Sequence, residues 1–186
     1  MKTLLIDNGS TLLTKLEKLI PGEKIVASLE DISSLSDNNY NLIVLSGGGR
    51  YIVTGNENIL RPEMGLVQST QVPIIGICYG CEVIVDTFGG TLEEMPRKEK
   101  GIIEVEIIYP DPIFDGKNIV RVYESHQWRI KSLPKDFIVL AKSSHGIEAI
   151  RHSFLPIYGF QFHPENFVDK TEGSEVFLKI FNSIAK

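Results

Sequence analysis

The stretch that most constrains this chain is an apolar segment, residues 72–77, that runs through Cys78 into a helix-like segment. The β-branched run is typical of a strand that is buried on both faces of a sheet. Gly76 and Gly80 flank the cysteine in the pattern glycine-x-nucleophile-x-glycine, which is typical of a sharp strand-to-helix turn that exposes a nucleophile. A thiol at the start of a helix also lies where the helix dipole favours the thiolate. Taken alone, the pattern leaves open that Cys78 is a small core residue.

The order of the expected elements favours an α/β fold. Short apolar strands alternate with helical periodicity up to Gly90, which predicts a mostly parallel, doubly wound central sheet flanked by helices. After Gly90 the apolar segments are extended, so we expect a strand-rich second half that ends in one helix. No linker interrupts the pattern, and we interpret residues 1–186 as a single domain. Expected strands cover residues 3–6, 24–27, 41–45, 72–77, 102–108, 119–123, 137–141, 147–150 and 157–162, and expected helices cover 12–20, 59–67, 82–88 and 176–184.

Composition narrows the class of protein. Hydrophobic residues make up 42% and charged residues 23%, as in an ordinary soluble protein. A net charge of −5 without a basic run argues against nucleic acid and anionic membranes as partners. The N-terminal segment becomes polar at Asp7, too early for a signal peptide, and no apolar run approaches the roughly 20 residues of a membrane span. Two cysteines three positions apart form no disulfide framework, so we expect a cytoplasmic location.

A cysteine nucleophile needs a base, and the sequence offers four histidines for that role. His163 follows an apolar strand, and Glu165 lies two residues further on, where an extended chain would place both side chains on one face. A carboxylate in that position would hold the imidazole in one tautomer. His126 is the second candidate, at the expected end of another strand. His145 and His152 lack such a context and are interpreted as surface or satisfied core residues.

The segment Ser46-Gly-Gly-Gly49 follows a buried strand and is a candidate loop of backbone donors. Glycines allow main-chain N–H groups to point at a developing anion. A flexible turn and a phosphate loop are the alternatives, although the Gly-Lys-Ser/Thr signature of a phosphate loop is absent. No metal-ligand spacing is apparent apart from Cys78-x-x-Cys81, so we expect no metal and no cofactor.

Together these motifs resemble the class I, or triad, glutamine amidotransferase family. The resemblance rests on Ser46-Gly-Gly-Gly49, Gly76-Ile-Cys-Tyr-Gly80 and Tyr158-Gly-Phe-Gln-Phe-His-Pro-Glu165, whose order and spacing cover nearly the whole chain. It implies a flavodoxin-like α/β fold with a nucleophile elbow. The segment Ile6-Asp-Asn-Gly9 is most similar to the separate glutaminase subunit of GMP synthetase.

The resemblance also implies a reaction. Cys78 would attack the side-chain amide of L-glutamine, His163 would act as general base and acid, and Glu165 would orient His163. Backbone N–H groups of Gly48 and Tyr79 would form the oxyanion hole. The glutamyl thioester would be hydrolysed to glutamate, and the ammonia would pass to a partner synthetase, since 186 residues leave no room for an ATP-using domain.

Substrate contacts are implied at a further set of positions: Gly47, Glu82, Ser125, Gln127 and Trp128. Three departures from the family pattern fall among or beside them. Cys81-Glu82 replaces a His or Met followed by Gln, Gly49 replaces a proline, and Gln127-Trp128 replaces the Gly-Asp that is common in GMP synthetase subunits.

Three alternatives remain open at this point. The first is a dithiol oxidoreductase that uses Cys78 and Cys81 as a Cys-x-x-Cys pair, as in thioredoxin-like proteins. The second is a catalytically weak or inactive binding subunit that kept the fold and lost turnover through Glu82. The third is a related cysteine hydrolase with another substrate.

Overall fold

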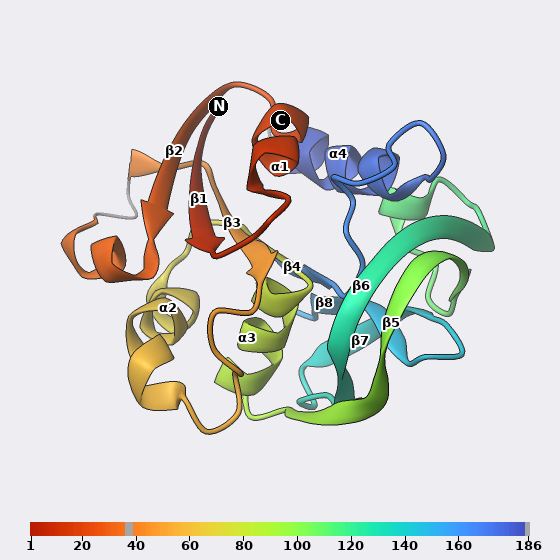
Figure 1. The fold of residues 1–186 in the computed structure, drawn as a ribbon. Coiled ribbons are helices and arrows are strands. Elements are labelled where there is room, and N and C mark those ends of the chain that lie inside the picture. Colours follow the sequence, from red (N-terminus) through yellow and green to blue (C-terminus); the bar gives the residue numbers. More distant parts are fainter. Residues whose placement is uncertain (36–38, 185–186) are drawn as a thin grey trace.

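A nine-stranded sheet lies at the centre of the computed structural model, which describes residues 1–35 and 39–184 (Figure 1). Its strands are β1 (Lys2–Asn8), β2 (Glu23–Ser28), β3 (Leu42–Gly48), β4 (Ile74–Ile77), β5 (Thr91–Ile107), β6 (Ile119–Ser132), β7 (Phe137–Lys142), β8 (Ile147–His152) and β9 (Ile157–Phe160). The helices are α1 (Leu13–Leu19), α2 (Glu57–Ser69), α3 (Tyr79–Thr87) and α4 (Gly173–Ile184), with 3-10 turns at Leu29–Ser34 and Pro112–Phe114.

The sheet has the order β2-β1-β3-β4-β9-β8-β7-β5-β6. Strands β2, β1, β3, β4 and β9 pair in parallel, and the pairs from β9 through β8, β7 and β5 to β6 are antiparallel. This is the predicted α/β fold, with the parallel strands in the first half of the chain joined by helices and the strand-rich second half extending the same sheet.

The inner parallel strands β1, β3 and β4 are buried on both faces, because alternate residues point to opposite sides and helices cover both. Side chains on one face of the sheet pack with α1 and α4. Side chains on the other face pack with α2 and α3, which lie on the opposite side of the sheet in Figure 1. The first set includes Leu5, Val44, Ile75, Leu16 and Phe177, and the second includes Leu4, Ile43, Leu45, Val67 and Ile84. The expected doubly covered sheet follows from these apolar runs.

The hairpin of β5 and β6 is much longer than expected. The sequence predicted strands that begin at residue 102 and end at residue 123, whereas β5 begins at Thr91 and β6 continues to Ser132. The added half of β5 is largely charged, so it lacks an apolar signal, and cross-strand pairs such as Glu93 with Arg129 stabilise it instead. His126 therefore lies within a strand, and its expected place at a strand end is wrong.

The predicted nucleophile elbow joins β4 to α3. Cys78 precedes the helix with a φ of 49° and a ψ of −105°, a conformation that L-residues rarely adopt. A Cβ at Gly80 would lie 2.5 Å from the carbonyl oxygen of Leu45, and a Cβ at Gly76 would lie 2.6 Å from the carbonyl oxygen of Gly80. The two glycines thus allow β3, β4 and α3 to approach closely enough to hold Cys78 in this turn.

No helix in the described part of the chain is both long enough and apolar enough to cross a membrane.

Candidate active site

The candidate site lies where the parallel strands end. Residues after β1, the last residues of β3, Cys78 after β4 and His163 after β9 gather at the carboxyl edge of the sheet. The chain reverses its direction across the sheet between β1 and β3, and such a point is where α/β proteins commonly bind ligands. Segment Ser125–Trp128 of β6 forms the opposite wall.

Cys78, His163 and Glu165 form a row in which a hydrogen bond joins His163 to Glu165. Nδ1 of His163 lies 2.8 Å from Oε1 of Glu165, and Cys78 and His163 both lie against Gly47. The sequence predicted that the two side chains share a face of a strand, but β9 ends at Phe160, and a turn brings them together instead. All three residues are buried, with His163 only 6% exposed.

The charges in this row favour a protonated imidazole. Burial opposes protonation of His163, yet Cys78 and Glu165, by charge and hydrogen bonding, raise the pKa of His163 well above its usual value. A protonated imidazole beside a thiol is the setting in which thiolate nucleophiles occur. The row can therefore supply both a nucleophile and a proton donor.

Within the segment Ser46–Gly49, Gly47 is the residue that lies against His163 and Cys78. A Cβ at Gly47 would lie 2.8 Å from Cε1 of His163 and 3.6 Å from the Cβ of Cys78, so a side chain there would displace the imidazole. At the next position, a Cβ on Gly48 would collide with the main chain of Asn8. The segment begins inside β3 rather than as a free loop, because β3 continues to Gly48.

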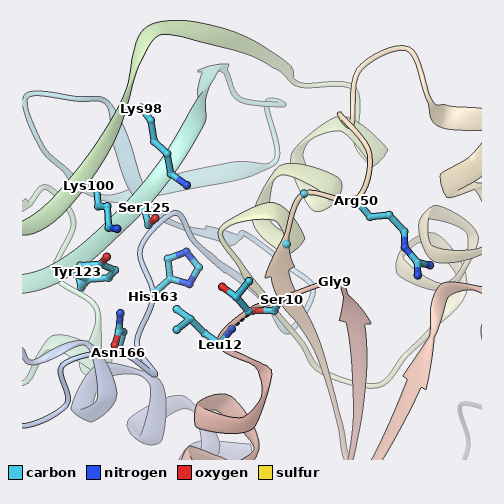
Figure 2. Close-up of a pocket in the computed structure, with 13 residues that line it drawn as sticks. Gly9, Ser10, Leu12, Arg50, Lys98, Lys100, Tyr123, Ser125, His163 and Asn166 are labelled. Carbon is cyan, nitrogen blue, oxygen red and sulfur yellow. Dashed lines mark hydrogen bonds between the residues drawn. The ribbon is translucent and has the colours of Figure 1, made fainter.

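Two cavities meet at the site. The smaller, of about 220 Å³, contains Cys78, Tyr79 and Glu82 and is closed by the β6 wall. The larger, of about 640 Å³, contains His163 and opens between the end of β1 and the β5–β6 hairpin (Figure 2). Their shared residues are Gly48, Gly49, Lys98 and Ser125. The thiol and the imidazole thus face connected spaces.

The larger cavity includes residues that the sequence did not single out. Figure 2 shows Lys98, Lys100 and Tyr123 on the hairpin and Asn166 after His163, with Arg50 on the far side. The two lysines lie in a part of β5 that has no apolar pattern, so hydrophobic periodicity could not predict them. They make the cavity basic although the chain as a whole is acidic.

Glu82 is buried at the base of the smaller cavity, with 6% of its surface exposed. Its Oε1 accepts a hydrogen bond of 3.0 Å from Nε2 of Gln161, a partner that the sequence did not predict. Burial raises the pKa of Glu82 to about 7, although Gln161, His126 and His163 act in the opposite direction. This carboxyl group therefore titrates near neutral pH beside Cys78.

The other predicted wall residues all lie at the smaller cavity. Ser125, Gln127 and Trp128 line it from β6, and the side-chain amide of Gln127 donates to the carbonyl oxygen of Met95 on β5. That bond directs the Gln127 side chain toward β5, so its backbone remains the part available to a ligand.

The remaining histidines have other partners. His126 is buried in β6, and its Nδ1 lies 2.8 Å from the carbonyl oxygen of Trp128. His145 pairs with Glu124 at 2.8 Å, and buried His152 accepts hydrogen bonds from the backbone of Phe154 and Leu155. His152 is thus a satisfied core residue as expected.

Comparison with known proteins identifies the class. The model of the family glutamine amidotransferase class-I matches residues 4–183, and the chain belongs to this family. It is 41% identical over 167 residues to the glutamine-hydrolyzing GMP synthase subunit of Pyrococcus abyssi, over 88% of this chain and 82% of that protein. It is 36% identical over 160 residues to the corresponding subunit of Methanococcoides burtonii, over 85% and 81%.

Solved structures agree on the fold. A putative GMP synthase subunit of Thermoplasma acidophilum superposes with a TM-score of 0.87 at 27% identity and covers 100% of this chain and 94% of that one. A glutamine amidotransferase of Thermotoga maritima superposes with a TM-score of 0.75 at 17% identity, over 98% and 83%, which shows the shared fold alone.

The buried state of Glu82 predicts a pH-dependent effect on stability. The folded chain holds the Glu82 proton up to about pH 7, whereas the usual pKa is 4.5, so the folded state binds more protons between these values. Stability contributed by this residue therefore falls as pH rises through that window. We expect Glu82→Gln to gain about 3 kcal/mol of unfolding free energy relative to the parent between pH 4.5 and pH 8.

Urea unfolding of both proteins at several pH values measures this gain. The contributions of the other titrating groups to the free energy of unfolding cancel when the variant is compared with the parent. A stability difference that stays constant from pH 4.5 to pH 8 would contradict a buried Glu82 with a raised pKa.

Proposed function

We propose that this chain hydrolyses L-glutamine to glutamate and ammonia with Cys78 as nucleophile, His163 as general base and acid, and Glu165 as the residue that orients His163. The observation that carries the proposal is the row of these three residues at a nucleophile elbow, in a chain of the class-I amidotransferase family. His163 is preferred to His126 because it hydrogen-bonds the carboxylate of Glu165 and lies with Cys78 against Gly47, whereas Nδ1 of His126 contacts a backbone carbonyl.

In the proposed reaction, the Cys78 sulfur attacks the side-chain amide carbon and an oxyanion forms. Backbone N–H groups of Gly48 and Tyr79, both at the smaller cavity, would stabilise that charge. His163 then gives its proton to the leaving nitrogen, and ammonia departs from the thioester. Water loses a proton to His163, attacks the thioester and releases glutamate with the free thiol.

The proposed substrate contacts follow the smaller cavity. Gly47 packs against His163 and against Cys78, which lines the cavity, and Glu82 lines it as well. The backbone of Ser125, Gln127 and Trp128 would hold the amino-acid end of glutamine. A space of about 220 Å³ suits a substrate of this size.

The dithiol alternative has no support in the structure. Cys81 is fully buried on the sheet side of α3, where a Cβ on Gly159 would lie 2.6 Å from its sulfur. Burial raises the pKa of Cys81 well above its usual value, which disfavours the thiolate that exchange requires. Cys81 is therefore interpreted as a packing residue.

Glutaminase activity should depend on Cys78 and not on Cys81. We expect Cys78→Ala to fold normally and to lose turnover by several orders of magnitude, because it removes the nucleophile. Cys81→Ala removes a buried sulfur and should cost about 1–2 kcal/mol of stability while retaining activity. Steady-state release of glutamate, with circular dichroism as the folding control, measures both. Equal loss in a folded Cys81→Ala protein would favour the dithiol chemistry.

The same cavity generates a prediction for activity at Glu82. Above pH 7 its ionised carboxylate adds negative charge beside a reaction that forms an oxyanion, and Gln removes that charge. We expect the kcat/KM of Glu82→Gln relative to the parent to rise from near unity at pH 6 to about tenfold at pH 8.5. A variant that is slower at every pH would instead show that Glu82 accepts a hydrogen bond from the substrate.

This experiment also tests the alternative of an inactive binding protein, which the departure at Glu82 favours. A parent chain that releases no glutamate, alone or with its partner, together with an active Glu82→Gln variant would establish that alternative.

We further propose that the ammonia passes to a synthetase subunit that makes GMP. The curated relatives are named as one subunit of glutamine-hydrolyzing GMP synthase, and this chain covers 82% and 81% of two of them. The GMP synthase of Thermosipho melanesiensis is 38% identical over 153 residues, but the match covers only 28% of that protein. On this proposal, a separate partner would supply what the rest of that longer protein supplies. With two free cysteines, a cytoplasmic location is part of this proposal.

The chain alone should therefore be slow. Adding the cognate ATP-using subunit with its substrates should raise the rate of glutamate release at least tenfold, because docking would complete the site and couple it to ammonia use. Glutamate release with and without that subunit measures the effect, and the subunit without nucleotide is the control. A purified chain that is fully active alone would contradict the hand-off.

A further inference from the structure

A second group of chemistry-bearing residues lies beside the candidate site. Glu124 and His126 point inward from β6, and Glu148 approaches them from β8. All three are buried, and one ligand-type atom from each lies within 4.8 Å of the others. Because Glu148 comes from a different strand than the other two, the sequence spacing did not reveal the group of three.

One atom of each residue is left without a partner. Oε1 of Glu124, Nε2 of His126 and Oε2 of Glu148 have no hydrogen bond within the described ranges 1–35 and 39–184. Nε2 of His126 lies 3.7 Å from Oε1 of Glu124, which is longer than a hydrogen bond. Buried polar atoms are nearly always satisfied, so three orphans that face one another indicate a missing ligand.

The second polar side-chain atom of each of these three residues already has a hydrogen-bond partner. Nδ1 of His126 bonds the Trp128 carbonyl, so it carries the hydrogen and Nε2 carries a free lone pair. Oε2 of Glu124 bonds His145 at 2.8 Å, and Oε1 of Glu148 accepts 2.7 Å from the Ser143 hydroxyl. Metal-binding residues are fixed by outer partners in the same manner.

We propose that Glu124, His126 and Glu148 bind a divalent transition-metal ion, with Zn²⁺ as the best match to one imidazole and two carboxylates. Zn²⁺ lies about 2.1 Å from such ligands, which places tetrahedral ligand atoms about 3.4 Å apart. The ligand-type atoms of the cluster, which lie within 4.8 Å of one another, therefore need to draw together by about 1.4 Å at most. Two positive charges would balance two buried carboxylates. The ion would also tie β8 to the part of β6 that forms the cavity wall.

A proton is the competing occupant. Burial, together with the charge of Glu124, raises the pKa of Glu148 well above its usual value, so Glu148 keeps a proton when no cation is near. A proton shared by the two carboxylates satisfies their oxygens but leaves Nε2 of His126 at 3.7 Å without a donor. The ion satisfies all three atoms, which is why we favour it.

The test is Zn²⁺ binding by the full chain without an affinity tag. Cys78→Ala is the parent protein throughout, so that Zn²⁺ bound by the thiol and His163 does not count. After treatment with a chelator, calorimetry should give one Zn²⁺ per chain. At a Zn²⁺ concentration about 100 times Kd the melting temperature should rise by about 5–10 °C, whereas Mg²⁺ should have little effect.

Variants in this parent locate the ion. Glu148→Gln should weaken Zn²⁺ binding at least a hundredfold, and Ser143→Ala, which removes an outer partner, should weaken it about tenfold. Glu63→Gln is the matched control, because Glu63 is equally buried, has one orphan oxygen and lies elsewhere, against Asn8. Its Zn²⁺ affinity should be unchanged.

Absence of stoichiometric Zn²⁺ binding by the parent would overturn the proposal and leave the shared proton as the occupant. Equal affinity in Glu148→Gln and Glu63→Gln would also overturn it. If Glu148→Gln does not fold, the parent titration and Ser143→Ala decide the question.

Discussion

The site depends on the close packing of β3, β4 and α3 around the Cys78 turn. A left-handed cysteine is costly, and it persists only where its surroundings leave no alternative. Gly76 and Gly80 remove the side chains that would keep the three elements apart. The amide of Cys78 also donates to the carbonyl oxygen of Phe160 at 2.6 Å, which fixes the end of β9 beside the turn. This hydrogen bond thus joins Cys78 to the segment that contains His163.

Charge is distributed differently inside the molecule and at its opening. Glu63, Glu82 and Glu148 are buried acids whose pKa values burial raises, so each holds a proton more tightly than an exposed glutamate. Lys98 and Lys100 line the larger cavity. The net charge of −5 belongs to the whole chain, and it does not reflect the charge of the buried acids or that of the larger cavity. The acidic composition argues against nucleic acid as a partner, yet the opening itself is suited to an anionic group.

The features that the sequence predicted correctly depend on residues that are close together in the chain. The elbow and the alternation of strands and helices each rest on residues within a few positions of one another, so the sequence alone sufficed. The His163–Glu165 contact was also predicted, although a turn rather than a strand forms it. The bond between Glu82 and Gln161 and the cluster of Glu124, His126 and Glu148 join distant segments, and only the sheet order brings them together. The length of the β5–β6 hairpin was missed because charged pairs, rather than apolar alternation, hold its outer half.

That hairpin contains an irregularity with an evolutionary consequence. Between Glu94 and Glu99, β5 advances five positions while its partner strand advances only from Trp128 to His126. The surplus residues bulge out of the ladder, and Lys98, which lines both cavities, belongs to them. A residue gained or lost in β6 would exchange its inward and outward faces. A change of length in the bulge would alter the structure only locally. Insertions at the bulge could therefore reshape the opening of the site during evolution, while the wall formed by Ser125–Trp128 keeps its register.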